Sequence, residues 1–232
     1  MSQRQPIFNA PGVVVAVLGA LVAVHLVRQV LSDAADDRLV ELLAFIPARV
    51  GDGADNYAGG WWAGLAQFVT HMFVHGDAVH LGVNSAWLLA FGTPVARRIG
   101  AVRFLAFFLL CGIGGALFFL PFNSAPMVGA SGAISGLMGG ALRFLFVPLT
   151  DGDAEALAGK ARRADLLSLY DTLTNRRILI GIVAWTLLNV VVALAAPTLF
   201  EGRKIAWEAH LGGFFTGLLT FGLFEPPPPR SQ

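Results

Sequence analysis

The chain has 232 residues, of which 56% are hydrophobic and only 13% are charged, and its net charge is +1. A soluble domain usually carries about a quarter charged residues, so this composition favours a protein that is dissolved mainly in lipid. The nearly balanced charge argues against a nucleic-acid partner, and the single cysteine, Cys111, excludes a disulfide within the chain.

Six apolar stretches follow one another along the chain, each near the ~20 residues that cross a hydrocarbon layer. The second is the most polar, because it contains His80 and Asn84, but AWLLAFG follows these residues and Arg97-Arg98 closes the stretch. The first is longer than the core of a typical secretory signal and has Arg28 near its far end, so we expect a retained helix. The sequence predicts an all-α membrane protein with six transmembrane helices, at about 12–31, 78–96, 104–120, 131–149, 178–196 and 206–224.

The basic residues predict how these helices are oriented. With a cytoplasmic N-terminus, the Arg97-Arg98 pair and the basic residues of 151–177 face the cytoplasm, as the positive-inside rule requires. Acidic residues collect in 32–77, on the outer side. In the absence of an appended domain or organelle signal, we expect a bacterial inner-membrane protein. The expected organisation is a short cytoplasmic N-terminus (1–11), a six-helix membrane domain with both ends inside (12–224) and a disordered cytoplasmic tail (225–232).

Three connections differ in character. The outer one, 32–77, is long enough to have structure of its own, and we expect short helices lying on the membrane with Trp61 and Trp62 at headgroup level. The inner one, 151–177, should be partly helical. The connection PFNSAPMVGA, residues 121–130, has no charge, and irregular uncharged backbone at membrane depth must be covered by protein or by a wet cavity. Ser131 should therefore lie inside the bundle, below the outer surface.

Polar residues occur in three groups in or beside the predicted spans. They are HMFVHGDAVHLGVN at 71–84, GASG at 129–132 and AHLGGFFTG at 209–217. All three groups fall at the outer ends of their helices in the predicted orientation. Polar side chains that only hydrogen-bond one helix to another are the alternative for any one of them. Ionisable residues within a membrane are costly, however, and their convergence at one depth favours a functional site.

The residue types in these groups are those that catalyse acyl transfer. A serine becomes a nucleophile when a neutral imidazole within hydrogen-bond reach takes its proton. The Ser131 N–H is an unpaired donor at a helix N-terminus, where developing negative charge is favoured, and Asn84 and His80 offer further donors. The small residues Gly129 and Ala130 leave room for a substrate backbone. Such a site needs a hydrophilic pocket that is open to water.

The three motifs together resemble the rhomboid family of intramembrane serine proteases. GASG begins one span, H-x3-H-x4-H-x3-N leads into an earlier one, and AHxxGxxxG lies in the last, so the resemblance covers about residues 60–220. It implies that Ser131 is the nucleophile and His210 the general base, in a dyad without an acidic third member. It also implies that His80, Asn84 and the Ser131 N–H hold the oxyanion. The substrates would be transmembrane segments of membrane proteins, with no metal or organic cofactor required.

The resemblance also assigns supporting roles. His71 and His75 match positions that are usually structural. Gly213 and Gly217 match a small-xxx-small face that brings the last helix close to the helix of Ser131.

Three positions depart from the family pattern. Many members have an aromatic residue four places after the nucleophile, stacked on the catalytic histidine, and this chain has Ser135 there. Phe214 or Phe215 is a candidate to compensate. The Trp-Arg pair often found before the first motif is Ala66-Gln67, and a glutamate common after the second span is Ala96. These departures affect regulation and stability more than the chemistry.

Other functions fit the residues less well. Ser135 is a rival nucleophile, but its N–H should be engaged in the helix. A zinc site at His71 and His75 would lack the glutamate of H-E-x-x-H. Asn189, placed on the inner half of the fifth span, does not by itself make a transport pathway. The main alternative is a rhomboid-like pseudoprotease, which binds transmembrane helices without cutting them and usually lacks the serine or the histidine.

Overall fold

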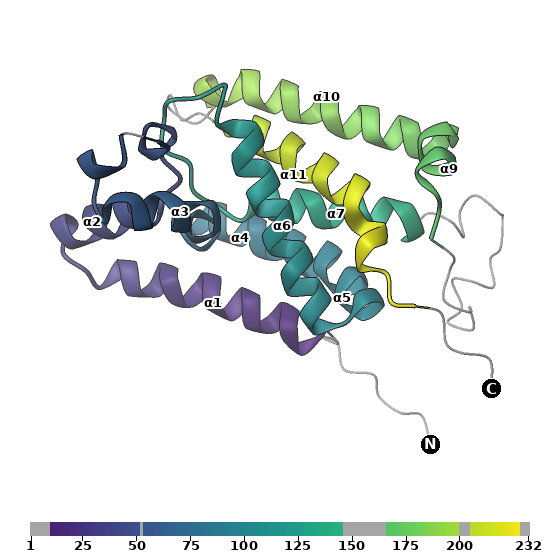
Figure 1. Cartoon of the computed structure of the whole chain (residues 1–232), viewed down its shortest axis with the longest axis horizontal. Helices are drawn as coiled ribbons and strands as arrows, with labels where there is room; N and C mark the ends of the chain where they lie inside the picture. Colours follow the sequence, from purple (N-terminus) through teal and green to yellow (C-terminus); the bar gives the residue numbers. More distant parts are fainter. Residues whose placement is uncertain (1–9, 52, 146–165, 200–204, 228–232) are drawn as a thin grey trace.

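The computed structural model describes residues 10–51, 53–145, 166–199 and 205–227. These residues form helices and loops without a β-strand, so the predicted all-α fold is confirmed for the described part of the chain (Figure 1). One isolated bridge pairs Phe45 with Met127. The helices are α1 (Gly12–Gln29), α2 (Asp33–Leu43), α3 (Gly60–Thr70), α4 (Ala78–Trp87), α5 (Thr93–Ile99), α6 (Ala101–Phe119), α7 (Ser131–Leu145), α9 (Leu169–Thr174), α10 (Arg176–Leu199) and α11 (Trp207–Thr220).

Three of these helices are long and apolar enough to cross a membrane. They are α1, α6 and the Arg176–Ala196 part of α10. The other predicted spans also lie in helices, of which the second is interrupted. Helix α4 runs through a π-helical turn at Leu88–Gly92 into α5, where Pro94 has no N–H to donate to the carbonyl of Ala90. Helix α7 is described up to Leu145, and α11 continues into a 3-10 turn at Phe221–Phe224.

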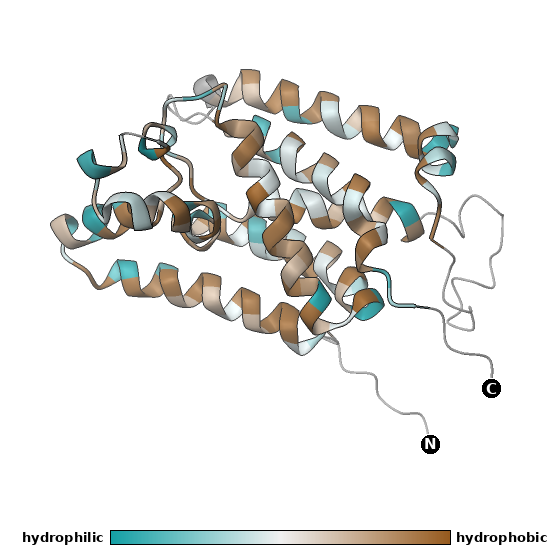
Figure 2. Ribbon diagram, in the orientation of Figure 1, coloured by the Kyte–Doolittle hydropathy of each residue, from teal (hydrophilic) through white to brown (hydrophobic). Residues whose placement is uncertain are grey.

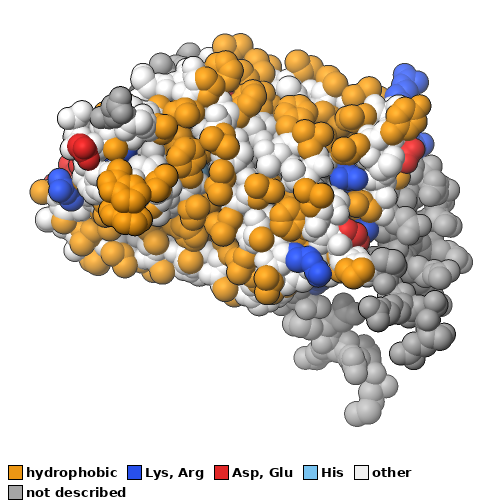
Figure 3. Space-filling model, in the orientation of Figure 1, with side chains coloured by type: hydrophobic (Ala, Val, Ile, Leu, Met, Phe, Trp, Pro, Cys, Tyr) orange, Lys and Arg blue, Asp and Glu red, His pale blue; other side chains and the backbone are white. Residues whose placement is uncertain are grey.

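The exterior of the bundle is largely apolar. Large aliphatic side chains of α10, including Ile180, Leu187 and Leu188, are exposed, and α1, α6 and α10 are mainly brown in Figure 2. On the face in Figure 3, charged side chains gather toward the two ends, with a broad apolar band between them. The start of α1 and the end of α11 lie at one end of the bundle, and α2 and α3 lie at the other (Figure 1). This is the surface of a protein surrounded by lipid.

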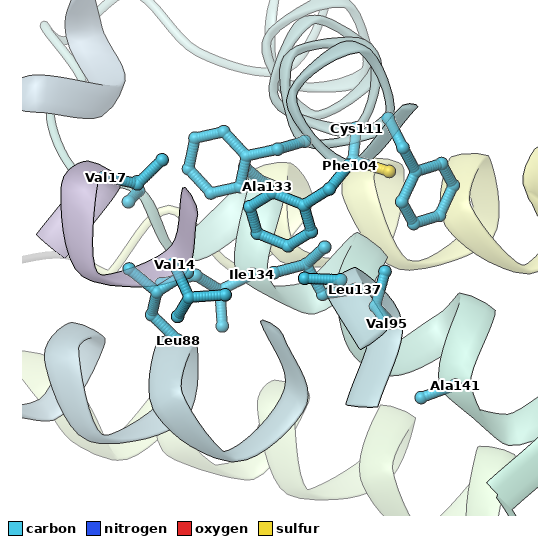
Figure 4. Packing of buried hydrophobic residues seen from close by; sticks show 14 of the residues in the cluster. Val14, Val17, Leu88, Val95, Phe104, Cys111, Ala133, Ile134, Leu137 and Ala141 are labelled. Carbon is cyan, nitrogen blue, oxygen red and sulfur yellow. The ribbon is translucent and has the colours of Figure 1, made fainter. Parts of the chain in front are cut away.

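The core joins the first half of the chain to α7. Val14 of α1, Leu88 after α4 and Phe104 of α6 pack against Ile134 and Leu137 of α7 (Figure 4). Glu225, where the predicted disordered tail begins, forms an ion pair with Arg98 at 2.8 Å, which ties the end of the described chain to α5.

Helices α7 and α11 touch through their backbones. A Cβ atom on Gly213 would overlap the carbonyl of Gly132, and one on Gly217 would overlap the carbonyl of Gly136. Small residues permit this close approach, so the predicted small-xxx-small contact between the two helices is confirmed.

The segment 32–77, which is predicted to lie on the outer side, contains short helices as expected. Two buried polar side chains hold it together. Gln67, which stands in the place of the family's arginine, accepts a hydrogen bond from the Ile46 N–H at 2.8 Å. The Arg49 side chain donates to the backbone carbonyls of Glu41, Leu42 and Ala44. These bonds join the turns after α2 to α3, which leads into the segment that carries His71.

Arg28 joins the end of α1 to two parts of this segment. Its guanidinium donates to both carboxylate oxygens of Asp36, at 2.7 and 2.9 Å, and to the backbone carbonyl of His75 at 2.5 Å. The hydrogen bond from Arg28 lowers the pKa of Asp36 below its ordinary value of 3.8. The stabilisation is therefore complete above that ordinary value and is lost as the pH falls through the lowered pKa.

Arg28→Met is accordingly expected to loosen α2 at neutral pH. Amide hydrogen exchange in α2, corrected for the intrinsic exchange rate at each pH, should be faster than in the wild type. The difference should shrink once acid protonates Asp36, because the wild-type pair is then also lost. Arg38→Met, which removes an exposed arginine of α2, serves as the matched control. Equal protection of α2 in the wild type and in Arg28→Met at neutral pH would contradict a stabilising role.

Candidate active site

Ser131 is the first residue of α7, and the chain before it is held from two sides. The N–H and the carbonyl of Met127 pair with Phe45 at 2.8 and 2.9 Å, and the Gly129 N–H donates to the carbonyl of His71 at 2.9 Å. Within the predicted covered connection, Met127, Gly129 and Ala130 are buried, whereas most of 121–126 is exposed. The prediction of a covered connection is therefore right only for the part next to Ser131.

Position 129 requires glycine for two reasons. Its φ of +120° lies in a region that side chains rarely adopt, and a Cβ there would lie 2.8 Å from ring atoms of His80. The same Cβ position is 3.9 Å from Ser131 Oγ. His80 and Ser131 therefore flank one glycine, with the backbone between them free of side-chain atoms.

His210 lies in the first turn of α11 and reaches Ser131. Its Nε2 is 2.8 Å from Ser131 Oγ, and both side chains are partly buried. Gly213, one turn after His210, is the residue whose backbone touches Gly132, the neighbour of Ser131. The close helix contact therefore sets the distance at which the hydroxyl and the imidazole meet.

His80 and Asn84 lie on one face of α4. The Asp77 carboxylate caps this helix by accepting from the His80 N–H at 2.8 Å. Asn84 is buried, and its Nδ2 donates to the His80 carbonyl at 2.9 Å, which leaves one amide hydrogen for another acceptor. His80 Nδ1 lies 3.4 Å from the Gly76 N–H, so its Nε2 carries the proton when the ring is neutral. This Nε2 is on the side of Gly129.

His71 and His75 have supporting positions. His71 Nδ1 bonds to the carbonyl of Gln67 at 2.8 Å, while its own carbonyl holds Gly129. His75 packs edge-on against His80, with the ring centres 5.0 Å apart. Burial lowers the pKa of each to about 4, so both rings are neutral at pH 7. Across the described ranges, no three His, Cys, Asp or Glu side chains are grouped so that they could hold a metal ion.

Asn189 of α10 also belongs to the site, a role that we did not expect from the sequence. Its Oδ1 is 2.9 Å from His210 Nδ1. We expected this residue on the inner half of its span and His210 at the outer end of its helix, but the contact places the two at the same level. A single amide in an otherwise apolar helix was the available signal, since such groups in lipid need a partner. The sequence could not say which partner that would be.

The aromatic residues proposed to replace the missing ring are occupied elsewhere. Phe214 stacks on Trp185 of α10, with ring centres 4.2 Å apart, and Phe215 packs edge-on against Phe214 at 5.4 Å. These rings join α10 to α11 one turn below His210. The contact that His210 makes with α10 is instead the hydrogen bond to Asn189.

Comparison with known proteins assigns the chain to a family. Residues 58–225 match the profile described as Rhomboid domain. The chain is 28% identical over 159 residues to Rhomboid protease GluP of Bacillus subtilis, covering 68% of this chain and 25% of that protein. It is 26% identical over 221 residues to Rhomboid protease AarA of Providencia stuartii, covering 85% and 67%. RHOMBOID-like protein 6, mitochondrial, of Arabidopsis thaliana is 28% identical over 163 residues, covering 69% and 44%.

These three matches cover most of this chain but a smaller share of each relative. The chain spans only a quarter of the length of GluP and a fifth of RHOMBOID-like protein 4 of Arabidopsis thaliana. Within this chain, however, the matched domain takes up most of the residues and includes all three polar motifs. Together with the apolar helices, it identifies an integral membrane protein that belongs to the rhomboid family.

Proposed function

We propose that this protein is an intramembrane serine protease that hydrolyses peptide bonds in or near transmembrane segments of membrane proteins. The observation that carries the proposal is the 2.8 Å contact between Ser131 Oγ and His210 Nε2 at the meeting point of α7 and α11. A hydroxyl at this distance from a neutral imidazole can lose its proton as it attacks a carbonyl. Membership of the rhomboid family, with relatives that are named proteases, supports the same reaction.

The reaction follows from the two side chains. Ser131 Oγ attacks the carbonyl carbon of the scissile bond while His210 Nε2 takes the hydroxyl proton. His210 then gives this proton to the leaving nitrogen as the C–N bond breaks, and an acyl-enzyme remains on Ser131. Water attacks the ester carbonyl, transferring a proton to His210, and Ser131 Oγ leaves with that proton. The substrate helix must unwind locally for its carbonyl to reach Ser131.

The donors around Ser131 support stabilisation of the oxyanion. The Ser131 N–H starts α7 and has no carbonyl of its own helix to bond. The free hydrogen of Asn84 Nδ2 and the proton on His80 Nε2 are the proposed side-chain donors. Gly129 and Ala130 provide the small-residue backbone along which the substrate would lie.

The proposed topology has six membrane crossings with both ends in the cytoplasm, in a bacterial inner membrane. The position of the start of α1 and the end of α11 at one end of the bundle supports a common side for both (Figure 1). The basic residues at Arg97-Arg98 support the cytoplasm as that side. The proposed reaction uses only the protein's own side chains, so it requires no metal or organic cofactor.

A cleavage assay in lipid tests the proposal. Purified protein in liposomes is incubated with a single-span substrate, and the products are mapped by mass spectrometry. A fluorophosphonate probe is applied in parallel, because it labels an activated serine without a substrate. Cleavage and labelling that both require Ser131 support the protease. Failure of the folded wild type to cleave or to take up the probe would favour the non-cleaving helix binder.

Asn84→Ala is expected to lower kcat ~10²-fold, as the loss of one oxyanion donor does in other acyl-transfer enzymes. Steady-state cleavage of the same substrate measures this, with KM nearly unchanged. Ser85→Ala is the matched control, because the Ser85 hydroxyl is bonded to the Leu81 carbonyl of the same helix at 2.7 Å. A loss smaller than about threefold in Asn84→Ala would assign Asn84 to packing rather than to oxyanion binding.

A further inference from the structure

The side-chain amide of Asn189 bridges His210 and the backbone of α10. We propose that Asn189 is a positioning residue, which fixes His210 in the tautomer and orientation that a general base for Ser131 requires. The inference rests on the proposed proteolytic function and adds a third member to the Ser131–His210 dyad.

The proton positions follow from a chain of donors and acceptors. Asn189 Nδ2 lies 2.9 Å from the backbone carbonyl of Trp185, which can only accept, so the NH2 group of the amide must face it. The amide oxygen then faces His210, with Oδ1 2.9 Å from Nδ1. An amide oxygen can only accept, so Nδ1 must carry the proton.

The proton on Nδ1 of His210 determines the state of Nε2 on the opposite side of the imidazole ring. A neutral imidazole with a proton on Nδ1 has its lone pair on Nε2, which is the atom 2.8 Å from Ser131 Oγ. In the other tautomer, Nε2–H cannot accept the serine proton and Nδ1 would meet a second acceptor. The Trp185 carbonyl therefore specifies the direction of the amide, and the amide specifies the basic nitrogen of His210.

This hydrogen bond also replaces a ring contact as the lateral support of the histidine. Ser135 stands where an aromatic ring would stack on His210, and Phe214 and Phe215 are engaged with Trp185 and with each other. Asn189 holds the side of His210 that faces away from Ser131. A fixed ring plane keeps Nε2 directed at Oγ while the hydroxyl is attacked and released.

A role in joining helices alone is the competing explanation for the same bond. Helix α10 packs loosely on the bundle, since large side chains such as Leu187 and Leu194 are exposed, so an interhelical hydrogen bond could simply attach it. Attachment predicts a loss of stability from removal of Asn189, with cleavage affected only through unfolding. Positioning predicts a loss of turnover in protein that remains folded. The two explanations can therefore be separated by kinetics.

Three variants separate positioning of His210 from attachment of α10. Asn189→Leu keeps the approximate volume but removes the acceptor, and Asn189→Asp keeps an acceptor oxygen. Leu188→Ala, at a neighbouring residue that is 59% exposed, is the matched control on α10. In liposomes, Asn189→Leu is expected to lower kcat and the rate of fluorophosphonate labelling ~10²-fold, with KM changed less than about threefold. Asn189→Asp should recover most of the loss, and Leu188→Ala should match the wild type.

Nitrogen-15 NMR of the histidine side chains provides a measurement that would not change if Asn189 only joined the two helices. In detergent micelles at neutral pH, wild-type His210, assigned by comparison with His210→Gln, should carry its proton on Nδ1. The Asn189→Leu protein should show a shift toward Nε2–H. Wild-type His210 with the proton on Nε2 would overturn the inference even if Asn189→Leu failed to fold.

The kinetic outcomes separate this inference from the proposed function. Cleavage that persists in Ser131→Ala would overturn both. Cleavage that requires Ser131 but is equal in Asn189→Leu and Leu188→Ala would overturn only the role of Asn189. Equal losses in Asn189→Leu and Asn189→Asp would also overturn it, because the acceptor oxygen would then not matter.

Discussion

Ser131→Ala and His210→Ala are each expected to lower turnover of a transmembrane substrate by about 10³-fold or more. Alanine at 131 removes the atom that forms the bond, and alanine at 210 removes the only imidazole within hydrogen-bond distance of Ser131 Oγ among the described residues. The double variant should be no worse than the single ones, because the two side chains act as a unit. Site-resolved mass spectrometry of products from liposomes measures this result.

Ser135→Ala is the matched control, since it removes a hydroxyl one turn further along α7. It should retain wild-type cleavage, with thermal unfolding confirming that all variants are folded. Strong cleavage in Ser131→Ala together with its loss in Ser135→Ala would transfer the nucleophile to Ser135. Cleavage that persists in both folded variants would end the serine-protease proposal.

Gly217→Ala is expected to destabilise the folded bundle by about 2 kcal/mol or more and to impair cleavage as well. The added methyl group would overlap the carbonyl and Cα of Gly136, and these backbone atoms cannot rotate away as a side chain can. The two helices must separate, which withdraws His210 from Ser131 although Gly217 is about two turns away from it. Equilibrium unfolding in mixed micelles measures the stability, and the cleavage assay measures the consequence for the site.

Gly181→Ala tests the same substitution where there is room. Nothing lies within 4 Å of a Cβ built on Gly181, so the change should be neutral or should stabilise α10, by up to about 1 kcal/mol from helix propensity. Equal stability of Gly217→Ala and Gly181→Ala would show that α7 and α11 can separate at little cost. The close contact would then not be what sets the Ser131–His210 distance.

The sequence predicted the helical class well, and it singled out Ser131 and His210, which the structure brings into contact, for local reasons. Apolar runs of about twenty residues specify helices in lipid wherever they pack. Ser131, His80 and His210 stood out because polar groups in such runs are costly, and GASG and AHxxGxxxG added a recognisable spacing. The small-xxx-small face also depended only on residue size, and it appears in the structure as predicted.

The less successful predictions concerned features that depend on contacts between segments far apart in the sequence. The connection at 121–130 looked uniform in sequence, but only its end is covered, because Phe45 and His71 lie over that part. The second predicted span is interrupted by a π-helical turn before Pro94. Asn189 was placed at the wrong depth, since its position in the bundle depends on how α10 lies against α11.

By itself, the sequence determined that this chain belongs in lipid as a set of helices and which polar side chains are candidates for the chemistry. Those properties come from the hydration of each residue type and from spacing along one helix, so they need no partner. The tertiary structure alone decided which nitrogen of His210 faces Ser131 and which faces Asn189. Asn189 and His210 are 21 residues apart and meet only through the packing of two helices. The location of a proton in that contact depends on which acceptor the fold brings to each ring nitrogen.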